Sequence, residues 1–456
     1  MSRNDPCDGG KVAAMWRKGL GYGSAAVTLL SLLGGFGSAQ GAALATKGAR
    51  PAPAATAQSQ TAVLWSAHGG NLGEVLADLI ARFNAQQPAA KITSEFQGDY
   101  YQALQKFQAA LAAKKVPDLV MLDCMYTPFF GGTGVYQNLD SFVSGPDGVD
   151  PKDLVDGFRE GDKWDGKFYA WSFARSTPLL YINADAFVEA GLEPVAPKTW
   201  TEMVAAARRT GKKDDKGTIV RYGVQLPLRN WWFIESMFRS NGGRIFDPKT
   251  GRATLDEPEQ IRVLQALVDL GKEKVLTTAP DSPRGDADFL QGNAAIKYGT
   301  TAQLGNFLAQ AKFKVAVGFL PKWKTYAVTP GGACLAIPSL AQNKAAAWTF
   351  MRWITSPDVT AEYATRTGYI PLRKSALQTD RLKSFYAKNP LWKVAVDQAQ
   401  YAAPLPLIKA VPLVVEDFYK LQEELLLGGA PVAATAKKYS QQMTDEFQDW
   451  LQEMKK

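Results

Sequence analysis

Residues Tyr169–Met203, YAWSFARSTPLLYINADAFVEAGLEPVAPKTWTEM, carry the strongest structural signal in the chain. Leu179–Ile182 is a short apolar run, long enough for a buried strand. Asn183 can cap the helix that follows, and Gly191 stands where that helix would end in a left-handed residue. A capping box begins a second helix at Thr199–Glu202. The stretch therefore predicts a strand followed by two helices.

The segment before this stretch alternates between strand and helix patterns. In order, these are a strand at Ala62–Trp65, a helix at Leu72–Asn84, a strand at Lys91–Phe96, a helix at Tyr101–Ala113 and a strand at Leu119–Leu122. Such alternation predicts a parallel sheet with helices on its faces. Ligands of such sheets bind at the carboxyl ends of the strands. Two amphipathic helices, Leu413–Leu427 and Ala433–Met454, are expected to close the chain.

The composition is that of a globular protein. The chain has 456 residues, of which 46% are hydrophobic and 21% charged, so we expect two or three domains' worth of core. The net charge is +8, but basic and acidic residues are interspersed along the chain. This pattern is typical of solvated faces, and we predict no nucleic-acid partner.

The N-terminus has the pattern of a targeting segment. Residues 1–45 combine a basic start, a short apolar segment and an Ala-x-Ala motif, which predicts a cleaved signal peptide; an uncleaved membrane anchor is the alternative. Cys7 precedes the apolar segment, so no cysteine is placed for lipid attachment. Residues 46–60 have the composition of a disordered linker. We therefore expect a soluble protein exported to a periplasm.

Motifs of common catalytic and cofactor sites are missing from the sequence. His68 is the only histidine, and it lies in a glycine-rich turn, whereas most zinc sites need more imidazole. No G-x-S-x-G motif is present to place a serine nucleophile, and no P-loop or G-x-G-x-x-G motif follows a strand. We therefore predict no catalytic residue, no metal site and no cofactor, and we interpret His68 as a loop residue.

Two cysteines follow the predicted signal peptide, Cys124 and Cys334. Export permits a disulfide between them. One pair does not specify a fold of this size, and the sequence favours two separate buried thiols, because free cysteine is often buried as a small apolar residue.

Four blocks of the chain resemble the extracellular solute-binding proteins of ABC importers. They are Leu64–Phe83, Gly98–Leu122, Tyr169–Met203 and a group of three short runs, Phe289–Ile296, Gly331–Pro338 and Thr367–Ala376. Each block alone is a weak match, but together they keep the order and spacing of the family. Within it, the chain resembles most the glycerol-3-phosphate-binding proteins, in the wider group that binds maltose and other oligosaccharides.

The resemblance implies a fold class and a domain organisation. We expect an α/β fold of the periplasmic-binding-protein type (type II-like), with mixed sheets flanked by helices in two lobes that hinge strands join. Lobe 1 would comprise residues 61–173 and 331–372, and lobe 2 residues 174–330 and 373–456. The ligand would lie in the cleft between the lobes, which would close around it.

The resemblance also implies a function. The chain would be the substrate-binding protein of an ABC importer, capturing a carbohydrate or glycerol-phosphate-like solute and delivering it, as a monomer, to membrane permease subunits with a cytoplasmic ATPase. The solute would be a saccharide, a polyol or a glycerophosphodiester. Two alternatives from other classes remain open: an exported carbohydrate-active hydrolase, and a ligand-sensing partner of a membrane receptor.

Individual positions carry over from the family to this chain. The predicted ligand-binding residues are Tyr100, Asp123, Ser176, Trp231, Trp232, Thr300, Gly331, Gly332 and Tyr369. Asp123 is included because it adjoins Cys124, which occupies the position of an expected glutamate. The diglycine would let its backbone amides approach the ligand. Core packing is the alternative for each aromatic residue.

The chain departs from the family where a phosphate would be bound. An expected arginine is replaced by Pro412, and proline cannot supply a bidentate guanidinium. Lys409, Arg175 or Arg373 are other possible sources of charge. Ala302 stands near the position of a tryptophan of the maltose-type proteins. A neutral saccharide, a polyol or a phosphodiester therefore fits better than a free phosphomonoester.

Overall fold

The computed structural model describes residues 60–247, 249–280, 282–403 and 411–453. The predicted signal peptide and residues 46–59 of the predicted linker lie outside these ranges. Gln60, which the sequence assigned to the linker, begins the first strand. Among the described helices, none combines the length and the apolar composition that crossing a membrane requires.

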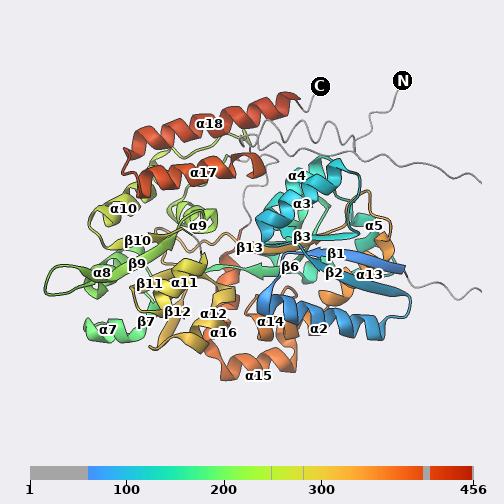
Figure 1. Ribbon diagram of the computed structural model, residues 1–456, viewed down its shortest axis with the longest axis horizontal. Coiled ribbons are helices and arrows are strands. Elements are labelled where there is room, and N and C mark those ends of the chain that lie inside the picture. The colour runs from blue at the N-terminus through green and yellow to red at the C-terminus, as the bar shows by residue number, and fades with distance from the viewer. Residues whose placement is uncertain (1–59, 248, 281, 404–410, 454–456) are drawn as a thin grey trace, which may run out of the picture.

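Sheet 1 has the strand order β2-β1-β3-β13-β6. Its strands are β1 (Gln60–Ser66), β2 (Ala90–Phe96), β3 (Leu119–Asp123), β6 (Trp171–Ser176) and β13 (Gly331–Ala336). The first three are parallel, as the alternating pattern predicts, and β13 lies antiparallel between β3 and β6. Helices α2 (Gly70–Gln86), α3 (Tyr100–Ala112) and α13 (Lys344–Ile354) pack on this sheet (Figure 1).

Sheet 2 has the order β10-β9-β11-β7-β12, with β8 paired to β9 at its side. Its strands are β7 (Pro178–Asn183), β8 (Lys212–Lys213), β9 (Ile219–Pro227), β10 (Leu276–Ala279), β11 (Ala294–Thr300) and β12 (Val315–Gly318). Strand β9 is parallel to both β10 and β11, whereas β7 is antiparallel to β11 and β12, so the sheet is mixed. The helices within this part of the chain are α7 (Ala184–Glu189), α8 (Trp200–Thr210), α9 (Trp231–Asn241), α10 (Pro258–Lys272), α11 (Ser282–Leu290) and α12 (Leu304–Gln310).

Short elements and a helical C-terminal part complete the described chain. Between β3 and β6 lie α4 (Thr127–Gly132), α5 (Asp140–Val143), α6 (Asp156–Arg159) and the hairpin of β4 (Lys163–Trp164) and β5 (Lys167–Phe168). After α13 come α14 (Pro357–Thr367), α15 (Asp380–Lys388), α16 (Pro390–Gln398), α17 (Val411–Leu426) and α18 (Val432–Glu453). Helices α17 and α18 pack on each other and on α10, along one side of the molecule (Figure 1).

The chain crosses between the two sheets inside the stretch that decides the fold. Strand β6 ends in sheet 1 at Ser176, and β7 begins in sheet 2 at Pro178, so a single residue, Thr177, joins them. The predicted local structure is confirmed: the Asn183 side chain accepts from the Ala186 N–H at 3.0 Å, and α8 begins with the predicted capping box. The two-lobed α/β fold is confirmed, with one large sheet in each lobe.

The exact limits of the lobes stay a prediction. The chain passes from sheet 1 to sheet 2 after β6 and returns to sheet 1 at β13, near the expected limits. After the expected limit at residue 372, however, α15 packs on α14, which in turn packs on α2 of lobe 1. We therefore propose that lobe 2 resumes only after α15.

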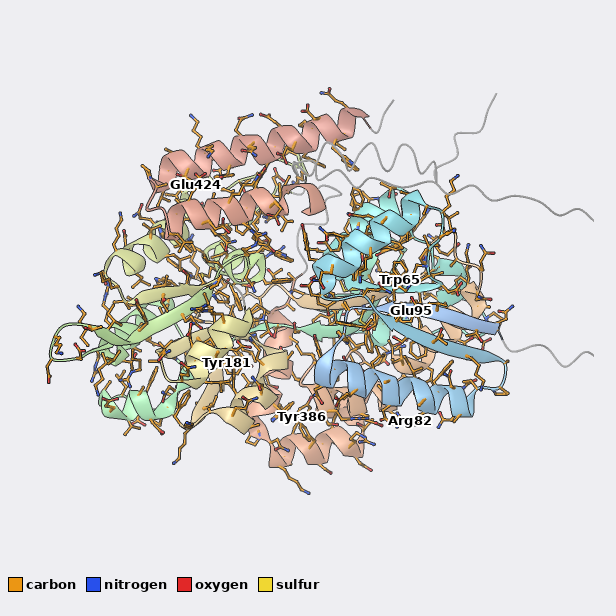
Figure 2. The ribbon with its side chains drawn as sticks, viewed as in Figure 1. Trp65, Arg82, Glu95, Tyr181, Tyr386 and Glu424 are labelled. Carbon is orange, nitrogen blue, oxygen red and sulfur yellow. A yellow bond between two sulfur atoms is a disulfide. The ribbon has the colours of Figure 1, made fainter. Side chains whose placement is uncertain are left out.

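Side chains fill both lobes (Figure 2). In lobe 1, Trp65 and Glu95 are register partners on β1 and β2, and the Trp65 Nε1–H donates to Glu95 Oε2 at 2.9 Å. In lobe 2, the Tyr181 hydroxyl donates to the Thr300 carbonyl at 2.7 Å, which links β7 to the end of β11. Both contacts join neighbouring strands within a lobe.

Cys124 and Cys334 form a disulfide, so the interpretation as two separate thiols is wrong. Strand β13 pairs with β3 in a register that sets Cys334 opposite Leu122, close to Cys124 just past the strand end. The two Cα atoms are 4.9 Å apart, a normal separation for a disulfide. The sequence separation of 210 residues hides this proximity.

Candidate functional site

A cavity of about 390 Å³ lies between the lobes. Lobe 1 contributes α3 and the segment after β3, and lobe 2 contributes the start of α9 and one face of α17. The lining residues are Tyr100, Tyr101, Leu104, Gln105, Gln108, Asp123, Met125, Tyr126, Arg229, Trp232, Val415, Glu416 and Tyr419. The volume and the mixture of rings with a few polar groups are typical of a small-molecule site.

The lobe 1 wall is built on a helix start and a strand end. Asp99 caps α3 in a capping box with Gln102, which sets Tyr100 as the first helical residue at the cavity. Asp123 ends β3 and accepts from the Met125 N–H at 2.9 Å. Burial raises the pKa of Asp123 to about 6, against the opposing effects of that N–H and of the Arg175 charge. Asp123 is therefore mainly a carboxylate at pH 7 and can accept hydrogen bonds from hydroxyl groups.

The lobe 2 wall carries a guanidinium. Arg229 lies between β9 and α9, and its Nη2 donates to both oxygens of Glu416, at 2.7 and 2.9 Å. The guanidinium lies over the Tyr419 ring, 5.0 Å from the centroid. The backbone of Arg229 has φ +52°, a conformation that is costly for a residue with a Cβ. Such strain is concentrated at functional sites, and here it accompanies a cation at the cavity.

The adjacent residues Trp231 and Trp232 lie in different surroundings. Trp232 lines the cavity and stacks on Trp231 with centroids 4.7 Å apart. Trp231 is buried and packs among Phe246 and Phe418 in an apolar pocket of lobe 2, so it supports its neighbour rather than lining the cavity. Trp231 therefore lies in the core of lobe 2 and Trp232 at the cavity, and the binding role of each stays a prediction.

Two donors at the cavity have no internal acceptor. Trp232 Nε1 and Gln108 Nε2 are buried, and neither makes a hydrogen bond to any group in the described part of the chain. Buried donors in native proteins are nearly always paired. Both nitrogens are thus enclosed donors beside the cavity, without a partner among the described residues.

The predicted diglycine, Gly331 and Gly332, packs closely against its neighbours on both sides, which are Trp232 and strand β6. Gly331 pairs with Ser176 on β6, and a Cβ added to Gly331 would lie 2.6 Å from Trp232 Nε1. Only glycine allows β13 and α9 to approach so closely. Gly332 has φ +98°, and a Cβ there would lie 2.0 Å from the Ala174 carbonyl oxygen. Both glycines are thus required by the hinge geometry, and their amide contacts to ligand stay a prediction.

The structure brings some of the predicted residues to the cavity and leaves others beside it. Tyr100, Asp123 and Trp232 line the cavity, and Gly331 adjoins Trp232. The other predicted residues, which are Ser176, Thr300, Gly332, Tyr369 and the buried Trp231, are not among the lining residues. Binding roles for all nine positions stay predictions.

Two of the alternative sources of positive charge, Arg175 and Arg373, do not line the cavity. Arg175 is buried, donates to the Gly332 carbonyl at 3.3 Å and lies over the Phe158 ring. Arg373 is buried over the Trp171 ring. Lys409 and the Pro412 side chain lie outside the described residues.

Several lining residues were not predicted from the sequence, among them Tyr126, Arg229, Glu416 and Tyr419. A signal for Arg229 was present, since it follows the apolar end of β9, and ligands bind where the strands of such sheets end. Glu416 and Tyr419 lie in an amphipathic helix, and no local feature distinguishes them from solvated positions.

Comparisons with known proteins find similarity in sequence over most of the chain. A family model described as bacterial extracellular solute-binding protein matches residues 78–393. The sn-glycerol-3-phosphate-binding periplasmic protein UgpB of Escherichia coli O1:K1 is 27% identical over 378 residues, covering 79% of this chain and 85% of that protein. The Yersinia pseudotuberculosis UgpB is 28% identical over 374 residues, covering 76% and 82%.

Solved structures extend the likeness to three dimensions. UgpB from Mycobacterium tuberculosis, in complex with glycerophosphocholine, has a TM-score of 0.78 and 29% identity, covering 86% of this chain and 100% of that one. The GacH receptor of Streptomyces glaucescens, solved with acarbose, has a TM-score of 0.76 and 20% identity, covering 86% and 99%, and shares the fold.

Proposed function

We propose that this chain, which belongs to the bacterial extracellular solute-binding protein family, binds a glycerophosphodiester in the cavity between its lobes. The chain is a solute-binding protein of an ABC importer for a sugar or a glycerophosphodiester. One observation supports a glycerophosphodiester over a sugar. Arg229 places a guanidinium at a cavity whose other lining residues include Trp232 and Tyr419.

The charges at the cavity favour a monoanion. Arg229 is the one arginine among the lining residues that the structure describes, and two carboxylates, Asp123 and Glu416, line the same cavity. One guanidinium can pair with the single charge of a phosphodiester. The second charge of a phosphomonoester would face the two carboxylates without a partner. The cavity therefore fits a phosphodiester better than glycerol-3-phosphate.

The remaining groups suit the two ends of such a ligand. Asp123 can accept from the hydroxyls of a glycerol end. Trp232, Tyr126 and Tyr419 offer ring faces to the other substituent, and aromatic faces bind apolar groups and cations. The glycerophosphocholine bound to the Mycobacterium tuberculosis relative supports this choice.

The proposal also includes the membrane partner, the location of the protein and the fate of the ligand. The family works with ABC permeases, and we infer that this chain delivers its solute as a monomer to a permease driven by a cytoplasmic ATPase. We also infer that it is exported to a periplasm with its signal peptide removed, in line with its periplasmic relatives. The relatives are binding proteins, and we propose that this chain likewise leaves its ligand chemically unchanged.

Isothermal titration calorimetry at pH 7.5 tests the choice of ligand. Glycerophosphocholine and glycerophosphoethanolamine are expected to bind, glycerol-3-phosphate to bind at least tenfold more weakly, and maltotriose to give no heat of binding. Tight binding of maltotriose with no response to either diester would replace the proposal with an oligosaccharide-binding function. Mass spectrometry after overnight incubation should recover the diester intact, and hydrolysis products would identify an enzyme.

A further inference from the structure

The single histidine of the chain lies between two tyrosine hydroxyls behind the cavity. His68 is 4% exposed in the loop after β1. Its Nε2 lies 3.2 Å from the hydroxyl of Tyr100, and its Nδ1 lies 3.1 Å from the hydroxyl of Tyr363 on α14. Tyr369 packs beside the same imidazole, with ring centroids 5.9 Å apart. A line of three hydrogen-bonded side chains therefore runs from the interior of lobe 1 to Tyr100 at the cavity wall.

The ring is held in its plane by other aromatic groups. Tyr363 stacks on the imidazole with an interplanar angle of 7°, and Tyr369 does so with an angle of 21°. Burial lowers the pKa of His68 to about 4, so the ring is neutral at pH 5 and above. A neutral imidazole has one N–H and one acceptor nitrogen, so its two neighbours must have opposite hydrogen-bonding roles.

The buried end of the line determines which nitrogen carries the proton. Tyr363 is 2% exposed, and its hydroxyl has no other hydrogen-bond partner in the described ranges than His68 Nδ1. A buried hydroxyl proton needs an acceptor. The Tyr363 hydroxyl therefore donates to Nδ1, the proton of the ring lies on Nε2, and Nε2–H donates to the Tyr100 oxygen.

Proton counting gives the consequence at the cavity. In this arrangement three protons, on Tyr363, His68 and Tyr100, serve two internal hydrogen bonds, and the hydroxyl proton of Tyr100 remains for a ligand. In the opposite tautomer the buried Tyr363 proton would have no acceptor. The Tyr100 proton would then be used for His68, and Tyr100 would offer only lone pairs to a ligand.

We propose that His68, as its Nε2–H tautomer, is a positioning residue that makes the Tyr100 hydroxyl a hydrogen-bond donor and so selects a ligand with an acceptor oxygen at that place. This inference rests on the proposed function and sharpens it. Phosphodiester oxygens are acceptors only, whereas a saccharide hydroxyl can take either role. The Tyr100 hydroxyl therefore joins the Arg229 guanidinium as a donating group at the site.

Because the chain has one histidine, its tautomer can be read directly from untagged protein. Long-range ¹H–¹⁵N correlation spectra of ¹⁵N-histidine-labelled protein at pH 7 should show the Nε2–H tautomer, with and without glycerophosphocholine. The spectrum should not change between pH 5.5 and 8. An Nδ1–H tautomer, or an equal mixture, in the wild-type protein would overturn the inference. This result needs no ligand, so it stands apart from any failure of the proposed function.

Variants connect the tautomer to binding. His68→Phe keeps a ring but no hydrogen bond, and we expect at least tenfold weaker binding of glycerophosphocholine. His68→Gln keeps one donor and one acceptor and should recover part of that loss. Tyr363→Phe, remote from the cavity, should convert the histidine signal to a mixture of tautomers. Wild-type affinity in a folded His68→Phe protein, judged by circular dichroism, or equal losses in His68→Phe and His68→Gln, would reduce His68 to a packing residue.

Discussion

The two walls of the cavity are held in place by different kinds of interaction. On the lobe 1 side, Tyr100 is anchored through buried neutral groups, with His68 only 4% exposed behind it. On the lobe 2 side, Arg229 is 43% exposed and is held by ion pairs with Glu416 and Glu423. One wall is a closed hydrogen-bond network, and the other is a charged surface open to water.

This difference indicates that the two walls contribute to ligand binding in different ways. Exposed ion pairs are screened by salt and exchange partners at little cost, so Arg229 can leave Glu416 for an anionic ligand. Buried hydrogen bonds between neutral groups are fixed in direction, because each unmade one is costly. We infer that lobe 2 supplies the attraction for charge, while lobe 1 supplies the geometry that the ligand must match.

Removal of the disulfide should have the largest effect, and that effect should be on stability and not on either wall of the cavity. Cys124→Ser with Cys334→Ser opens a covalent loop of 210 residues, which should lower the free energy of unfolding by roughly 3–5 kcal/mol. Urea unfolding followed by tryptophan fluorescence measures this change. The folded double variant should keep glycerophosphocholine affinity within about threefold, since neither sulfur lines the cavity. An unchanged unfolding midpoint would contradict the expectation.

Loss of the guanidinium should remove most of the contribution of lobe 2. Arg229→Met should weaken glycerophosphocholine binding roughly 100-fold, or about 2.7 kcal/mol, because the phosphate then has no cation. Arg208→Met is the matched control: Arg208 donates two hydrogen bonds of 2.8 Å to Glu273, but it does not line the cavity. Calorimetry should show a change of less than twofold for the control. Similar losses in both variants would point to a general effect of charge.

Acidification tests the lobe 1 wall. The pKa of Asp123 is raised to about 6, so a contact that needs its carboxylate is present above that pH and is lost as the pH falls through it. Affinity for the diester should fall about tenfold between pH 7 and pH 5, because most Asp123 side chains are then protonated. Asp123→Asn should bind more weakly at pH 7 and show a flat profile over this range. A wild-type profile that is also flat would exclude Asp123 from the contact.

The smallest expected effect concerns the competition between Glu416 and the ligand for Arg229. Glu416→Gln keeps the shape of the side chain but removes the charge that holds Arg229 in the free protein. Diester affinity should rise about threefold, a change typical of an exposed ion pair. Weaker binding in this variant would mean that Glu416 itself holds the ligand, for example through a cationic substituent.

Local signals explain what the sequence could predict. Asn183 and the Thr199–Glu202 capping box are correct because a helix cap depends on neighbours within three residues. The parallel pairing of β1, β2 and β3 follows from alternation over a short stretch of chain. The fold class therefore follows from signals that lie close together in the sequence.

The site could be predicted only in part, for a related reason. Glu416 reaches Arg229 from 187 residues away in the sequence, and nothing near either residue indicates the pair. The disulfide could not be predicted from nearby residues either, since the proximity of its cysteines depends on the pairing of β13 with β3. Trp231 and Trp232 are adjacent and chemically equal, and only the packing of α9 decides which one faces the cavity.

The position of β13 has a consequence for the order in which the protein can fold. Sheet 1 needs β13 between β3 and β6, yet more than 150 residues, including all of sheet 2, separate β6 from β13 in the chain. During synthesis from the N-terminus, β3 keeps an unpaired edge until residues 331–336 emerge. Long-range pairing of this kind slows folding, so lobe 1 remains incomplete while lobe 2 already has its strands. A chain that completes the sheet of its first lobe after the sheet of its second stays unfolded for longer, which is compatible with crossing a membrane before it folds.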